Sequence, residues 1–116
     1  MSHHKPTPAV MRIFIACSPT YHNRRAIMEA LGSIFIDTIE QQREYYFFDC
    51  PAMTEIFDDG VFNRALFREL PHGDGPRSAA IKDLKFAYVV AGGDDKFVTD
   101  ILSEIGGNDT LLVRLD

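Results

Sequence analysis

The chain has 116 residues, of which 46% are hydrophobic and 25% are charged, and its formal net charge is −5. These values are typical of one globular domain large enough to bury its own core, and the negative charge disfavours a nucleic-acid partner. No apolar run is long enough to cross a bilayer, so we expect no membrane partner.

The N-terminal residues and the number of cysteines indicate the domain boundaries and the cellular compartment. Residues 1–9 contain His3, His4 and two prolines but no apolar segment of the kind found in secretion signals. We expect a disordered lead-in over residues 1–9 and a single α/β domain over residues 10–116. The two cysteines, Cys17 and Cys50, are few enough to indicate reduced thiols and a cytoplasmic protein. Both fall at predicted strand ends, which allows a redox pair, although two buried free thiols are the simpler expectation.

Strands and helices are expected to alternate along the chain. Apolar or aromatic runs predict strands at residues 10–17, 45–48, 86–91 and 111–113. The spacing of apolar residues predicts helices from about residue 23, at 61–70, at 79–84 capped by Ser78, and at 97–105. This order favours a three-layer domain with a mainly parallel four-stranded sheet. Arg114 and Asp116 indicate that the last strand lies at a sheet edge.

Two interpretations of residues 32–42 are open. If Gly32 ends the first helix, residues 34–36 form a strand that pairs with residues 45–48, and the fold is α+β and ferredoxin-like. We favour one helix to about Gln42, because residues 40–43 are good helix formers and lack the Gly, Asn or Asp of short hairpin turns.

Polar and glycine-rich loops follow the predicted strands. In a parallel sheet these loops share one edge, where small ligands of α/β proteins bind. The first helix carries Arg24 and Arg25 in its first turn, where the helix dipole disfavours cations unless an anion is bound. Candidate ligand-binding residues for a nucleotide or sugar phosphate are therefore Ser18, Thr20, Arg24, Arg25, Gly92, Gly93 and Asp95.

Each of these candidate ligand-binding residues also has a simpler structural explanation. Every strand must end in a turn, and Gly, Ser and Asp are turn residues. Asp94 or Asp95 can cap the helix that ends at Gly106 and Gly107, and the two arginines can pair with nearby carboxylates. No cofactor or metal ligand set is recognisable in the sequence.

The order of three segments resembles nucleoside deoxyribosyltransferase-like domains at a few positions. These segments are an opening strand that ends in Ser18 and Pro19, a later buried strand, and the stretch Ser-Glu-Ile-Gly at residues 103–106. The resemblance implies cleavage or transfer at an N-glycosidic bond, with Glu104 as the nucleophile and Asp94 or Asp95 as its helper.

We interpret the sequence first as a small non-catalytic module that binds a partner protein or assembles with itself. It has no matched set of acid, base and nucleophile, and the aromatic-rich residues 45–48 and 57–67 offer contact surface. The alternative is the nucleotide or sugar-phosphate protein described above, as a binder or an enzyme.

Overall fold

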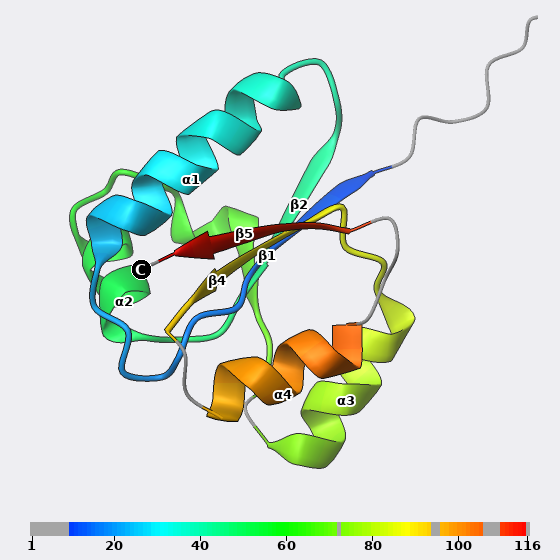
Figure 1. The fold of residues 1–116 in the computed structure, drawn as a ribbon. Helices are drawn as coiled ribbons and strands as arrows, with labels where there is room; N and C mark the ends of the chain where they lie inside the picture. The colour runs from blue at the N-terminus through cyan, green and yellow to red at the C-terminus, as the bar shows by residue number, and fades with distance from the viewer. Residues whose placement is uncertain (1–9, 72, 94–95, 106–109, 116) are drawn as a thin grey trace, which may run out of the picture.

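In the part of the chain that the structure describes, the sheet is entirely parallel and has five strands in the order β3-β2-β1-β4-β5 (Figure 1). A computed structural model describes residues 10–71, 73–93, 96–105 and 110–115. The strands are β1 (Met11–Ile15), β2 (Arg43–Phe47), β3 (Phe67–Glu69), β4 (Tyr88–Gly92) and β5 (Leu111–Leu115). The predicted α/β domain with a parallel sheet is confirmed, with one strand more than expected, and the ferredoxin-like alternative is wrong.

Helices cover both faces of the sheet. The helices α1 (Arg24–Asp37) and α2 (Pro51–Asp58) lie on one face, and α3 (Asp74–Asp83) and α4 (Lys96–Ile105) lie on the other (Figure 1). The alternation of side chains along β1 explains the two cores. Ile13 and Ile15 are buried against α1 and α2, whereas Phe14 and Ala16 are buried on the side of α3 and α4.

Helix α1 begins where the sequence predicts and ends earlier. Asn23 is its N-cap, and the Asn23 side chain accepts a hydrogen bond from the backbone N–H of Ala26. Residues 34–36 are helical, as we favoured, but the helix ends at Asp37 and not near Gln42. Thr38 is its C-cap, and the N–H and the hydroxyl of Thr38 both donate to the carbonyl of Ile34. The short connection then leaves room for β2.

The predicted helix over residues 61–70 is wrong. The helix of this region is α2, which lies earlier and has Pro51 in its first turn, and Gly60 follows it with a φ of 72°. A 3₁₀ turn (Arg64–Leu66) then leads into the edge strand β3. Phe67 of β3 is buried with its ring 4.7 Å from that of Tyr45. Pairing with β2 therefore buries Phe67 in an aromatic cluster.

The remaining boundaries differ in smaller ways. Helix α3 begins at Asp74 with Gly73 as its N-cap, so Ser78 lies inside the helix and does not cap it. The predicted edge position of the last strand is confirmed, since among the described residues β5 pairs only with β4. None of the helices within the described ranges could span a membrane. The expected lead-in (residues 1–9), the caps Asp94 and Asp95, and the stop at Gly106 and Gly107 lie outside the described residues.

Candidate functional site

The strand order reverses between β1 and β4, and this is where doubly wound sheets bind ligands. The segment after β1 leads to α1 on one face, and the segment after β4 leads to α4 on the other (Figure 1). The parallel topology brings four of the predicted ligand residues together at this point: Ser18, Thr20, Gly92 and Gly93.

Protein atoms fill the space between these two loops. The backbone N–H of Ser18 donates to the carbonyl of Gly92 at 2.9 Å. The buried ring of Tyr21 lies so close to Gly92 that a Cβ there would be 2.7 Å from two ring atoms. Gly93 has a φ of 94°, and a Cβ there would be 2.9 Å from the Cβ of Ser18. The glycines thus serve close packing against the first loop.

The polar groups of the first loop are engaged with each other. The side chain of Ser18 is buried, and its hydroxyl lies 3.2 Å from the hydroxyl of Thr20. The backbone N–H of Thr20 also donates to the Ser18 hydroxyl at 3.4 Å. These contacts hold the turn in shape.

The two predicted phosphate-binding arginines contact carboxylates. Arg24 forms an ion pair with Asp59, just after α2, and lies 3.8 Å from Glu55. Arg25 is exposed and lies 3.8 Å from Glu29 on the next turn of α1. Their positive charges are therefore balanced within the protein, which fits the plainer of the two sequence interpretations.

The predicted nucleophile Glu104 lies elsewhere in the fold. It is in the last turn of α4, and its carboxylate accepts hydrogen bonds from Arg77 and Ser78 of α3. The Nη2 atom of the buried Arg77 is 3.1 Å from the Glu104 carboxylate. Glu104 therefore connects α3 to α4 and lies away from the loops after β1 and β4. Its predicted helpers, Asp94 and Asp95, lie outside the described residues.

The edge strand β5 is a feature that the sequence analysis placed correctly but did not recognise as a site. Leu111 is 57% exposed and Leu112 is 47% exposed. The N–H of Leu111 donates to the carbonyl of Ala87, toward β4. Because peptide groups alternate in direction along a strand, those of Leu112 and Arg114 point away from the sheet. No described residue pairs with that outer edge.

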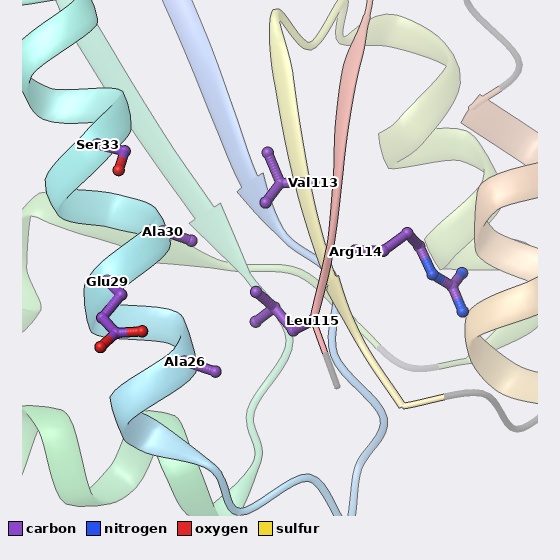
Figure 2. A pocket seen from close by; sticks show the side chains of 7 residues that line it. All are labelled: Ala26, Glu29, Ala30, Ser33, Val113, Arg114 and Leu115. Carbon is purple, nitrogen blue, oxygen red and sulfur yellow. The ribbon is translucent and has the colours of Figure 1, made fainter.

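A groove of about 300 Å³ runs between α1 and β5. Figure 2 shows Val113 and Leu115 pointing toward α1, and Arg114 pointing to the other side of the sheet. The side of α1 that faces them carries the small residues Ala26, Ala30 and Ser33, with Glu29 beside them. The face of β5 next to α1 is therefore only partly covered.

A second exposed apolar cluster lies at the end of α1. It consists of Phe35, Ile36 and Ile39, of which Ile36 is 71% exposed. The guanidinium of Arg43 lies 4.2 Å from the centre of the Phe35 ring and covers part of this cluster.

Within the described ranges, no group of three or more His, Cys, Asp or Glu side chains is arranged to hold a metal ion. No protein-family model, curated protein or solved structure matches this chain.

Proposed function

We propose that this protein is a non-catalytic module that assembles with a second copy of itself through β5. The observation that carries this proposal is an edge strand with two exposed leucines and outward peptide groups that lack a partner within the described part of the chain. Such an edge is a template for pairing with another strand.

The two edges of the sheet are built differently. The opposite edge, β3, has only three residues, and two of them are the exposed charged residues Arg68 and Glu69. Short length and charge are the usual means of preventing edge pairing. Strand β5 has five residues, of which only Arg114 is charged. The contrast supports β5 as the edge that pairs.

A second copy fits β5 because the strand is complementary to itself. We infer an antiparallel pair about a twofold axis at Leu112, with Leu111 facing Val113 of the other copy and Arg114 facing Thr110. In this register the outward peptide groups of Leu112 and Arg114 meet outward groups of the partner strand. No like charges face each other, and the pairing uses both free β5 edges, so that the assembly stops at a dimer.

Sedimentation velocity over a range of micromolar concentrations tests this proposal. The wild-type protein should form a dimer, and Leu112→Lys should be monomeric because it places two positive charges face to face. Ile36→Lys is the matched control, since it makes the same kind of change at an exposed residue of α1 and should leave the dimer intact. A monomeric wild type, or a dimer that Ile36→Lys abolishes and Leu112→Lys does not, would contradict the proposal.

The nucleotide or sugar-phosphate alternative has less support. Tyr21 fills the space at Gly92, and the carboxylates of Asp59 and Glu55 balance the charge of Arg24. We also propose that the protein acts in the cytoplasm, because both of its cysteines are free thiols, as expected in a reducing compartment.

A further inference from the structure

The two cysteines are brought together by the pairing of β1 with β2. Cys17 follows the end of β1 by two residues, and Cys50 follows the end of β2 by three residues as the N-cap of α2. The two strands are in register up to Ile15 and Phe47, and beyond them the N–H of Phe48 donates to the carbonyl of Ile15 at 3.2 Å. Both cysteines therefore leave the same edge of the sheet from neighbouring strands.

The loops that carry the cysteines are also tied to each other. The backbone N–H of Ala52 donates to the carbonyl of Tyr21 at 3.1 Å, so the first turn of α2 is fixed against the loop after β1. Both cysteines belong to the core on the side of α1 and α2, and their thiols are close enough for a hydrogen bond between them. Continuing the register of β1 and β2 places Cys17 opposite Asp49, the residue before Cys50. A strand spacing of about 5 Å and a rise of about 3.3 Å per residue then give a separation of about 6 Å, which is within the roughly 4.4–6.8 Å between the Cα atoms of a disulfide.

The two thiols differ in how readily they ionise. The hydrogen bond from Cys17, together with the N–H groups of Ala52 and Met53, lowers the pKa of Cys50 even though burial opposes this. Cys50 is the N-cap of α2, and the N–H groups and the dipole at a helix start favour a thiolate over a thiol. The hydrogen bond with Cys50 and burial raise the pKa of Cys17 far above its usual range. The position of Cys50 at the start of α2 therefore favours Cys50 over Cys17 as the thiolate.

We propose that Cys17 and Cys50 form a dithiol–disulfide site that a hydroperoxide oxidises, with Cys50 as the attacking thiol and Cys17 as the resolving thiol. Both residues are almost completely buried, but Cys50 lies between the exposed residues Asp49 and Pro51. An oxidant close to water in size reaches Cys50 through small movements of this loop.

The reaction with hydrogen peroxide proceeds in two balanced steps. The Cys50 thiolate attacks one peroxide oxygen, an S–O bond forms, the O–O bond breaks, and the released hydroxide takes up a proton to become water. The sulfur of Cys17 then attacks the sulfur of the Cys50 sulfenic acid. The S–S bond forms as the S–O bond breaks, and the Cys17 proton leaves with the hydroxyl group as a second water. The two sulfurs lose two electrons, and the peroxide is reduced.

The test uses the reduced 116-residue chain, hydrogen peroxide and intact-mass spectrometry after alkylation of the remaining thiols. We expect the folded protein to lose two hydrogen atoms and both alkylation sites while it remains a single covalent chain. Cys17→Ser should stop at a Cys50 sulfenic acid that dimedone traps. Cys50→Ser should react with peroxide at least tenfold more slowly than the wild-type protein.

Three results would overturn the proposal. In the first, peroxide does not oxidise the folded wild-type protein, so that both thiols can still be alkylated once the protein is denatured, whereas peroxide does oxidise a sample unfolded in urea. The second is a disulfide that links two chains. The third is an equal rate of reaction with peroxide for Cys17 in the Cys50→Ser variant and for Cys50 in the Cys17→Ser variant. The wild-type measurement needs no substitution, so the proposal is tested even where a variant does not fold.

Discussion

The ring of Tyr21 lies directly against the backbone of Gly92, with no room between them for a methyl group. This contact closes the point of strand-order reversal, where a doubly wound sheet would otherwise open to a ligand. It also explains why the last residue of β4, which is buried, is a glycine. The residue at position 92 must let the first loop pack onto the end of the strand.

We predict that Gly92→Ala destabilises the protein by about 1–3 kcal/mol, because the added Cβ would overlap ring atoms of Tyr21 that are buried and have little space to move. Gly32→Ala is the matched control. Gly32 is exposed within α1, and a Cβ there would meet no atom within 4 Å. The control should be stabilising by roughly 0.5–1 kcal/mol, since alanine favours a helix over glycine. Urea unfolding of both variants measures the two changes. Equal stabilities would show that Tyr21 does not pack on Gly92.

Glu104→Ala should destabilise the protein by about 2–3 kcal/mol, because it removes the carboxylate that pairs with the buried guanidinium of Arg77. The side chain of Arg77 is 8% exposed and that of Glu104 is 24% exposed, so water compensates only part of the loss. Glu29→Ala removes the carboxylate of the exposed pair with Arg25 and should change the free energy of unfolding by less than about 0.5 kcal/mol. Thermal or urea unfolding compares them. A loss for Glu104→Ala no larger than that for Glu29→Ala would argue against a structural ion pair between α3 and α4.

The carboxylate of Glu44 should titrate at acidic pH. The hydroxyl of Tyr46, which donates to it at 2.7 Å, and the guanidinium of Arg12, at 3.0 Å, hold the pKa of Glu44 below its usual value of 4.5. Because the pKa is lower in the folded protein, this carboxylate contributes stability above pH 4.5, and that stability is lost as the pH falls through the folded-state pKa. Carbon-13 NMR of the side-chain carboxyl measures the titration. Tyr46→Phe should move the pKa back toward 4.5, and a wild-type value at or above 4.5 would contradict the assignment.

The sheet and the first helix were predictable because their patterns are local. Continuous apolar runs mark β1 and β4, and the spacing of Ile27, Leu31 and Ile34 marks the buried side of α1. Strand β3 was missed for the opposite reason. The burial of Phe67 depends on Tyr45 and Phe57, which are brought to it only by the fold.

The candidate site was predictable only in part. Parallel strands do bring Ser18 and Thr20 to Gly92 and Gly93, as the topology implies. The sequence could not reveal that Tyr21 turns back onto Gly92, or that Glu104 pairs with Arg77 from a helix 27 residues earlier. The apolar residues of β5 indicated a strand. They could not indicate an open edge, because an apolar sequence is expected both for a strand covered on both faces and for a strand with one unpaired edge.

Exchange of the Leu112 backbone amide with deuterium, followed by NMR at several protein concentrations, tests the β5 dimer most directly. The N–H of Leu112 points away from β4, so it has no partner among the described residues of a single chain and should exchange rapidly in dilute protein. Pairing with a second β5 would give it a hydrogen bond, and its protection should rise with concentration in parallel with the fraction of dimer. The Val113 amide, which points toward β4, is the internal control and should be protected at all concentrations. A dimer in which Leu112 still exchanges rapidly, or a protein that stays monomeric, would contradict the account.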